Sequence, residues 1–429
     1  MNLRRLSGGA SRETFSFDFE VGASRRGLIL QRLRPGTTTD TVGVGIETEA
    51  GLLRVAGDHG VPVAGVVATD DGALLGSAGM VVERLTGETI ARKILRDDEW
   101  AAARAHLGAA VGRAAAGIHA IPADAVPGLQ LADPVAQYRE VLDGLGEPHP
   151  AFELGLRWLD ANRPPRGDTC VVHGDYRLGN LLVDHDGLAA VLDWELAHVG
   201  DPVEDLGWLC VRAWRFGSAL PAGGVATREE LLAAYEAASG VTVDPAALRW
   251  WELLGTLKWG VICVMQAFGH LSGTSRSVEL ATIGRRVCEN EWDVLGLLPG
   301  GPLEVTPGGN AEALSVLHDR PHLHELVEAV REWVDDDVRH GTEGRLSFHA
   351  RVATNALRMV ERELAQGSGP AAAHAARLAG LGCADDADLA ARIRSGALDD
   401  RSDELRQVVA TSVHDKLLVA NPGWLQPDQ

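Results

Sequence analysis

The hydrophobic pattern of residues 1–85 predicts a β-rich unit that contains one helix. Apolar and polar positions alternate in FSFDF (15–19), and short apolar runs occur in GLILQRL (27–33) and MVVERL (80–85). Such runs are typical of β-strands. Between them, ETEAGLLRVAGDHG (47–60) repeats apolar positions at helical spacing and ends in glycine, as helices commonly do.

The middle of the chain is mainly helical, with a short β segment inside it. The pattern turns helical over 90–165, where Leu107, Val111, Ala115 and Ile118 share one face of an Ala-rich segment. Strand-like runs follow in TCVVHGD (169–175), NLLVD (180–184) and LAAVLDWE (188–195), the last two joined by a turn. Residues 204–298 are again predicted to be mostly helical.

A Pro/Gly-rich stretch separates this part from the rest. PGGPLEVTPGGN (299–310) has little to bury and is predicted to be a linker. Beyond it, 311–429 reads as a helical accessory domain, with its clearest amphipathic segments at 323–338 and 345–364. The expected fold class is therefore α+β with an all-helical C-terminal domain appended.

Composition and charge exclude several classes of function. The chain has 429 residues and a formal net charge of -20, which disfavours binding to nucleic acid. The sequence has no apolar stretch of roughly 18 residues to span a membrane, and no secretory signal is recognised at its start. The five cysteines are scattered singly, as expected for reduced thiols in the cytoplasm.

The stretch VVHGDYRLGN (171–180) carries polar residues that packing does not require. Asn180 follows Asp175 by five positions, and Asp193 ends the next apolar run, in VLDWE. Phosphoryl transfer needs a carboxylate that accepts the proton of the attacking hydroxyl, together with oxygen ligands for Mg²⁺. The set therefore predicts a phosphotransferase site; the alternative is a polar β-turn with a structural aspartate.

HGDYRLGN, followed by VLDWELAHVGDPVEDLGWL, resembles the aminoglycoside phosphotransferase family of kinase-like enzymes over roughly residues 3–298. The subgroup it resembles includes the kinase domains fused to acyl-CoA dehydrogenases. The resemblance implies a two-lobed protein-kinase-like fold with ATP in the cleft, an N-lobe over 1–85 and a C-lobe over 86–298.

The resemblance also implies roles for residues of the central motif. Asp175 would be the catalytic base, and Asn180 and Asp193 would hold Mg²⁺. His173 would brace the loop backbone. Arg177 would either neutralise the transferring phosphate or anchor the loop.

Three acidic residues near the motif are expected to have less direct roles. For Asp201 and Asp205 a structural role is preferred over metal binding, because the first precedes Pro202 and the second can anchor a helix. Glu195, two residues past Asp193, could instead contact the substrate or support the site.

The N-lobe is expected to bind the nucleotide. In LSGGASRETF (6–15), Gly8 and Gly9 would let backbone amides approach the phosphates, and Ser11 and Arg12 would hydrogen-bond them. A plain β-turn is the alternative for this stretch. The backbone around Glu83–Leu85 would face the adenine, by position alone.

A kinase-like site also needs a cation on its third strand, paired with an acid on the next helix. The run GLILQRLRPG has no lysine, so Arg32 is the first choice and a register shift would turn Gln31 inward instead. Glu49 is the expected acid, with Glu47 as the alternative.

The phosphate acceptor is less well determined than the reaction. We expect a small-molecule hydroxyl, with a hydroxyacyl-CoA-type metabolite as the specific hypothesis and an aminoglycoside as an alternative. A catalytically silent nucleotide-binding scaffold is the competing interpretation. For the accessory domain, a regulatory, dimerising or substrate-shaping role is a hypothesis based on its fusion to the kinase-like part, and a homodimer is one expected assembly.

Overall fold

The computed structural model describes most of the chain, and the described part divides into two compact units. The first unit comprises Met1–Asp133 and Pro164–Gly255, and the second comprises Pro134–Arg163 and Thr256–Pro427. The described residues are 3–6, 12–21, 24–34, 43–131, 133–165, 167–275, 277–301, 305 and 323–426.

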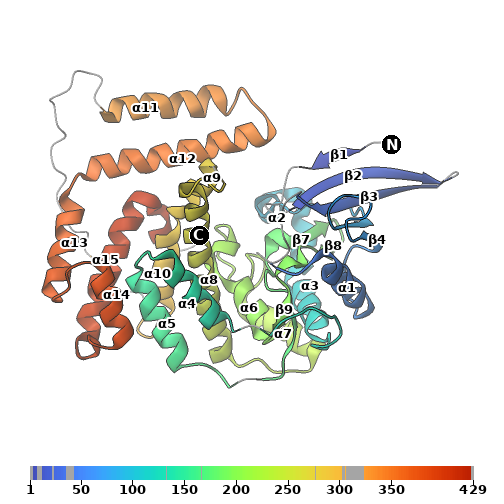
Figure 1. Cartoon of the computed structure of the whole chain (residues 1–429), viewed down its shortest axis with the longest axis horizontal. Helices are drawn as coiled ribbons and strands as arrows, with labels where there is room; N and C mark the ends of the chain where they lie inside the picture. The colour runs from blue at the N-terminus through green and yellow to red at the C-terminus, as the bar shows by residue number, and fades with distance from the viewer. Residues whose placement is uncertain are drawn as a thin grey trace. The chain divides into compact units, whose positions relative to one another are not determined.

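An antiparallel five-stranded sheet forms the N-terminal part of the first unit (Figure 1). Its strands lie in the order β1-β2-β3-β5-β4. They are β1 (Arg4–Leu6), β2 (Arg12–Val21), β3 (Ser24–Leu33), β4 (Val66–Asp70) and β5 (Gly79–Glu83). Helix α1 (Ile46–Asp58) packs against β4 and β5 and buries its apolar face there. The predicted strands at 15–19, 27–33 and 80–85 and the helix at 47–60 are confirmed.

The remainder of the first unit is helical, with two small two-stranded sheets. Strand β6 (Cys170–Val172) pairs with β9 (His198–Gly200), and β7 (Leu181–Asp184) forms a hairpin with β8 (Gly187–Val191). The helices are α2 (Ala91–Arg96), α3 (Ala101–His119), α6 (Val203–Cys210), α7 (Arg228–Ser239) and the start of α8 (Pro245–Leu271). The predicted core face of α3 is confirmed, because Leu107, Val111, Ala115 and Ile118 are fully buried.

The described part of the second unit consists of helices. They are α4 (Pro134–Leu145), α5 (Pro150–Ala161), the end of α8, α9 (Val278–Gly284), α10 (Val287–Leu297), α11 (Leu323–Trp333), α12 (Gly344–Gln366), α13 (Gly369–Gly380), α14 (Asp386–Ser395) and α15 (Ser402–Ala420). Helices α11 and α12 confirm the amphipathic segments predicted at 323–338 and 345–364. A single π-helical turn continues α11 to Val338.

The two units do not coincide with the segments proposed from the sequence. Helices α5 and α10 pack against α14 and α15, so they group with the C-terminal helices in the second unit. The predicted linker at 299–310 falls mostly outside the described residues. The domain boundaries at 85, 298 and 310 therefore stay predictions.

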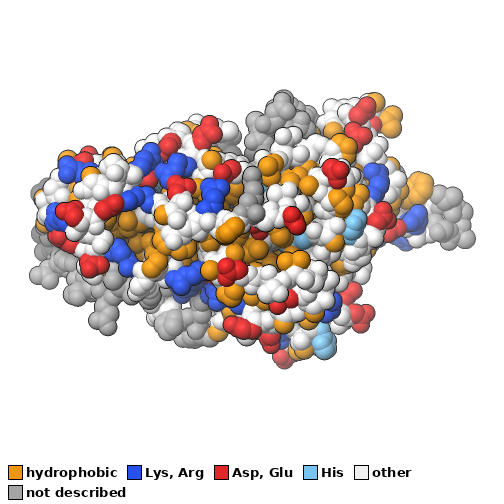
Figure 2. Space-filling model, turned by 90° about the horizontal axis from the view of Figure 1, so that it is seen from below, with side chains coloured by type: hydrophobic (Ala, Val, Ile, Leu, Met, Phe, Trp, Pro, Cys, Tyr) orange, Lys and Arg blue, Asp and Glu red, His pale blue; other side chains and the backbone are white. Residues whose placement is uncertain are grey.

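Charged side chains of both signs are interspersed on the face drawn in Figure 2. This pattern accompanies the formal net charge of -20. No helix within the described part of the chain is both long and apolar enough to cross a bilayer.

Candidate active site

The loop that begins at His173 joins β6 to β7 and is anchored by a buried carboxylate. Asp205 on α6 accepts the backbone amides of His173, at 2.7 Å, and Gly174, at 2.9 Å. Gly174 has φ 77°, and a Cβ at this position would collide with the backbone oxygen of Leu196. The loop thus requires glycine at 174 and a carboxylate at 205, in line with the structural role preferred for Asp205.

Asp205 keeps its charge although it is completely buried. His119 Nε2 lies 3.1 Å from its Oδ2, and His119 Nδ1 lies 3.0 Å from the hydroxyl of Tyr235. Burial by itself would raise the pKa of Asp205, but the hydrogen bond and charge of His119 and the amide of His173 bring it down to about 2. Sequence reasoning missed His119 and Tyr235, which lie on α3 and α7 and belong to no motif.

The imidazole of His173 ties the loop to the segment that precedes Asp193. Its Nε2 lies 3.0 Å from the backbone oxygen of Leu192, and its Nδ1 accepts the amide of Asp175 at 3.2 Å. This pattern fits a neutral ring with the proton on Nε2. Burial lowers the pKa of His173, which favours the neutral form. The geometry is that of a brace for the loop, as the sequence suggested.

The carboxylate of Asp175 is oriented by three donors. Arg177 Nε lies 3.0 Å from Oδ1 and 3.2 Å from Oδ2. Trp208 Nε1 donates to Oδ1 at 2.9 Å, and Asn180 Nδ2 donates to Oδ2 at 2.6 Å. Three hydrogen bonds of this kind hold a carboxylate in one orientation. Trp208, in the motif GDPVEDLGW, thus orients the candidate base, a role that was not predicted for it.

Arg177 lies over an aromatic platform. Its guanidinium carbon is 4.8 Å from the ring centroid of Trp214, and the rings of Trp208 and Trp214 are 5.2 Å apart. A guanidinium over an indole face is favourable and is fixed in position. The structure therefore brings Arg177 and Asp175 together, with the indoles of α6 and of the following turn behind them.

Asn180 directly precedes β7 and Asp193 follows β8 after one intervening residue, so both lie at the open end of the hairpin. Asp193 adopts left-handed backbone angles, φ 62° and ψ 66°, which cost energy outside glycine and often occur at functional sites. Burial, followed by the nearby carboxylates of Glu195, Asp175 and Glu49, raises the pKa of Asp193 to about 7. Asn180 uses Nδ2 to contact both the backbone oxygen and the carboxylate of Asp175.

This arrangement fits a divalent cation. The carboxylates of the site, Asp193 and its neighbours Glu195, Asp175 and Glu49, outnumber the guanidinium groups of Arg12 and Arg177. The excess of negative charge favours binding of a cation. Asn180 has its amide oxygen as the remaining ligand atom, and Asp193 has its carboxylate, both of which are hard oxygen donors suited to Mg²⁺. The described residues contain no group of three or more His, Cys, Asp or Glu that could hold a metal by themselves.

Arg12, at the start of β2, forms the ion pair that was expected of Arg32. Its Nη1 contacts Oε2 of Glu49 on α1, and both side chains are buried. Its Nε lies 3.7 Å from Oε2 of Glu195. Burial raises the pKa of Glu49 although Arg12 opposes the shift. Glu49 is therefore the paired acid of α1, and Glu47 is exposed.

Arg32 does not meet Glu49, and the predicted pairing of these two residues is wrong. Arg32 lies opposite Glu13 in the β2–β3 ladder and pairs with it at 2.8 Å. Side chains alternate along a strand, so Gln31 lies on the other face, opposite the buried core residue Met80. The register thus places Gln31, the alternative, on the side of the sheet that packs against the core.

Some of the other residues predicted to contact the nucleotide lie within the described part of the chain and some do not. Gly8, Gly9 and Ser11 lie outside the described residues. Glu83 ends β5 and donates its amide to the backbone oxygen of Gly65 at 2.9 Å, so this amide is engaged within the sheet. Leu85 follows the strand and is 36% exposed.

A known family and several known proteins match parts of this chain. Residues 2–251 match the family described as "Phosphotransferase enzyme family", and residues 340–424 match a domain of unknown function. "Acyl-CoA dehydrogenase family member 10" of Mus musculus is 27% identical over 236 residues, or 52% of this chain and 21% of that protein. "Probable acyl-CoA dehydrogenase IBR3" of Arabidopsis thaliana is 27% identical over 47% of this chain and 27% of its own length. The chain thus spans about a quarter of these relatives.

A solved structure shares the fold. The crystal structure of a candidate aminoglycoside phosphotransferase from Ralstonia eutropha JMP134 aligns with 68% of this chain and 92% of its own, with a TM-score of 0.55 and 21% identity. The kinase-like fold predicted from the sequence is confirmed.

Proposed function

Because the chain belongs to the phosphotransferase enzyme family, we propose that it is a small-molecule kinase that transfers the γ-phosphoryl group of ATP to a hydroxyl. The observation that supports this most directly is the carboxylate of Asp175. This carboxylate lies in the loop between β6 and β7 and accepts hydrogen bonds from Arg177, Trp208 and Asn180.

Asp175 would orient the acceptor hydroxyl and take its proton. The two oxygens of a carboxylate offer about four lone-pair sites in total. Three donors hold Asp175, so one site is left for the acceptor hydroxyl. Arg177, beside the base and fixed over Trp214, would add positive charge where the phosphoryl group moves. Asn180 and Asp193 would hold Mg²⁺, and the bound ion would neutralise negative charge on the phosphates.

Arg12 and Glu49 would form the ion pair of the nucleotide lobe. Kinase-like sites use a cation from the sheet and an acid from the neighbouring helix. The absence of lysine on β3 was the one argument for a catalytically silent scaffold. Arg12 supplies the cation from β2 instead, which supports the active enzyme over the scaffold.

A hydroxyacyl-CoA-type metabolite is the acceptor that we propose first. This proposal is supported by the names of the two relatives, both of which contain the words acyl-CoA dehydrogenase. Each relative has a segment that is similar to this chain. An aminoglycoside is the alternative acceptor, supported by the name of the similar solved structure. ATP, Mg²⁺, a cytoplasmic location and a homodimer remain predictions.

The test is release of ADP from ATP by the full chain with Mg²⁺ and a panel of hydroxyacyl-CoA esters, free hydroxy acids and aminoglycosides. We expect turnover with at least one hydroxyacyl-CoA ester, and a loss of at least roughly 100-fold in Asp175→Asn, the scale of general-base catalysis. Calorimetry should show that this variant still binds ATP. Turnover confined to the aminoglycosides would replace the proposed acceptor. Binding of ATP without turnover on any of the panel would favour the scaffold.

A further inference from the structure

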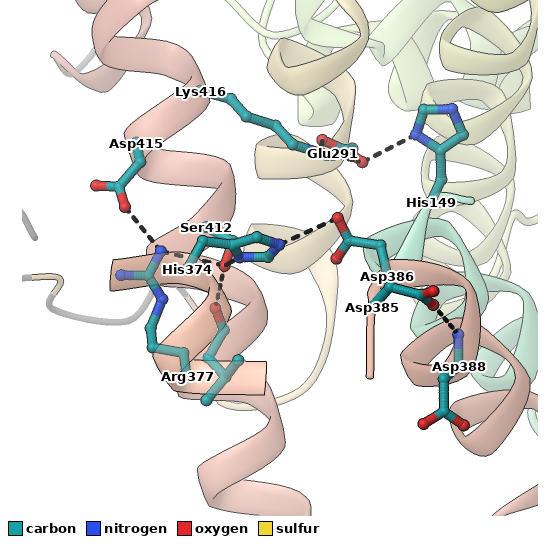
Figure 3. Close-up of polar contacts among 11 residues, drawn as sticks. His149, Glu291, His374, Arg377, Asp385, Asp386, Asp388, Ser412, Asp415 and Lys416 are labelled. Atoms are coloured by element: carbon teal, nitrogen blue, oxygen red, sulfur yellow. Dashed lines mark hydrogen bonds and ion pairs between the residues drawn. The ribbon is translucent and has the colours of Figure 1, made fainter. Parts of the chain in front are cut away.

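The second unit contains a cavity of about 430 Å³ into which several polar side chains converge. Residues of α9, α10, α12, α13, α14 and α15, with the turn at 147–149, line it. The close-up in Figure 3 shows side chains from α13, α15 and the start of α14 that point toward one another there. None of these side chains belongs to the proposed kinase site.

Three of these side chains form a serine–histidine–aspartate series. Nδ1 of His374 lies 2.9 Å from Oγ of Ser412, and Nε2 of His374 lies 3.1 Å from Oδ2 of Asp386 (Figure 3). All three residues line the cavity, and the side chain of His374 is 26% exposed. In an activated nucleophile, a hydroxyl lies next to a base, and a third group orients that base. Ser412, His374 and Asp386 are arranged in this way.

The proton positions follow from these contacts. Asp386 accepts hydrogen bonds, and a hydrogen bond to His374 lowers its pKa, so an ionised carboxylate faces the proton on Nε2. In a neutral ring, Nδ1 is then a free acceptor directed at Ser412. The hydroxyl of Ser412 has a second acceptor, the backbone oxygen of Val408 at 2.9 Å. Rotation about one bond of Ser412 therefore aims its proton either at the helix or at the base.

A cation lies beside the hydroxyl. Nη2 of Arg377 is 3.4 Å from Oγ of Ser412 and 2.8 Å from Oδ2 of Asp415, and the latter contact fixes its position. His374 and Arg377 share one face of α13, as residues three apart on a helix do. Nε of Arg377 is buried without a hydrogen-bond partner among the described residues. The guanidinium thus has capacity to stabilise an oxyanion formed next to Ser412.

The other walls suit an acyl group with a polar end. Apolar lining is provided by Val287, Pro370, Ala371, Val419 and Ala420. Lys416 also lines the cavity, and it pairs at 3.2 Å with the buried carboxylate of Glu291. A mainly apolar wall with a few convergent polar groups is typical of a small-molecule site.

We infer that Ser412, His374 and Asp386 form a second active site, which hydrolyses carboxylic esters or thioesters of small acyl groups. Oγ of Ser412 bonds to the carbonyl carbon while its proton passes to Nδ1 of His374. The oxyanion lies against Arg377 and then collapses, and the alcohol or thiol leaves with the proton from Nδ1. Water next attacks the acyl-serine, gives one proton to Nδ1 and releases the carboxylic acid, and that proton returns to Ser412.

The test uses the full chain with a fluorophosphonate probe and with p-nitrophenyl butyrate and butyryl thiocholine as substrates. We expect the probe to label Ser412, as located by mass spectrometry of peptides. Ser412→Ala and His374→Asn should each lower hydrolysis at least ~100-fold. Asp386→Asn should lower it by a smaller factor and move the midpoint of the pH–rate profile to lower pH, because the imidazolium loses the carboxylate at 3.1 Å.

Two variants serve as controls. Thr411→Val removes the neighbouring hydroxyl of α15, which makes the same type of bond to a backbone oxygen, that of Gln407 at 2.8 Å. It should keep labelling and hydrolysis, and so should Asp175→Asn. The inference is overturned if the folded wild-type chain neither reacts with the probe nor hydrolyses either substrate, if another serine carries the label, or if Ser412→Ala hydrolyses at the wild-type rate. Melting temperatures establish that each variant is folded.

Discussion

The indole Nε1 of Trp208 donates a hydrogen bond to Oδ1 of Asp175 at 2.9 Å. Trp208 lies on α6, in the segment that also supplies Asp205, so one short helix both anchors the loop backbone and orients the candidate base. The two contacts have different consequences, because one acts on the carboxylate proposed to accept the proton and the other on the fold of the loop.

Loss of the indole donor is expected to lower turnover. Trp208→Phe removes one hydrogen bond to a charged group, worth ~1.5 kcal/mol, so kcat should fall about 10-fold. The KM for ATP should change little, because the hydrogen bond of the indole is made to the candidate base. Steady-state kinetics would show this. Trp251→Phe is the matched control, since Trp251 is also buried and its indole Nε1 has no hydrogen-bond partner among the described residues. An equal fall in both variants would point to packing instead.

Arg12 and Arg32 are expected to differ in their importance. Arg12→Ala leaves Glu49 buried without its cation, which costs about 3–5 kcal/mol for a broken buried pair, and should weaken ATP binding. Arg32→Ala removes an ion pair with Glu13 at a partly exposed position. It should therefore change the free energy of unfolding and the affinity for ATP only a little. Chemical denaturation and calorimetry with ATP measure the two effects.

The double variant Arg12→Ala with Glu49→Gln provides the control for this pair. It removes the unpaired charge and should regain part of the lost stability without regaining ATP affinity. If Arg32→Ala weakened ATP binding more than Arg12→Ala, the assignment of the cation would be wrong.

Asp205 is expected to make stability depend on pH. Its pKa is about 2 in the folded chain, against about 3.9 when unfolded, so its ionised form contributes roughly 2–3 kcal/mol at pH above the unfolded value. This contribution should be lost as the pH falls through 4 toward 2. The free energy of unfolding of wild type minus that of Asp205→Asn should therefore shrink as the pH falls below about 4. A difference that stayed constant down to pH 3 would contradict the assignment.

Gly174 and Gly240 form a matched pair for testing the loop. Their φ angles are 77° and 74°, but a Cβ would collide with the oxygen of Leu196 only at Gly174, while Gly240 has open space. Alanine at either position adopts an unfavourable conformation, at a cost of about 1 kcal/mol or more. Gly174→Ala should cost more than Gly240→Ala in urea denaturation and should also reduce turnover. Equal costs would show that the loop can move away from Leu196.

The nearest neighbours of the candidate base followed from local pattern. Asp175, Arg177 and Asn180 lie within six positions of one another, and the short loop between β6 and β7 keeps them together. The amphipathic face of α3 was likewise readable, because apolar positions at helical spacing indicate which side is buried. Glu49, the acid expected to pair with a cation of the sheet, is buried on α1, and the alternative Glu47 is exposed.

The ion pair with Glu49 was not readable, because it depends on which strand, and which face of the sheet, supplies the cation. A shift of one residue in strand register exchanges Arg32 for Gln31, and residue types alone do not decide between them. The ladder between β2 and β3 placed Arg32 opposite Glu13 and left Arg12 to meet Glu49.

By itself the sequence determined the reaction class, the motif that carries it and most of the helices and strands, since each depends on residues close together in the chain. Only the tertiary structure decided the partners that come from distant segments: Trp208 for Asp175, His119 for Asp205, and His374 for Ser412. Contacts between separate helices depend on how the helices pack, and hydrogen bonds of this kind leave no periodic signal in the chain.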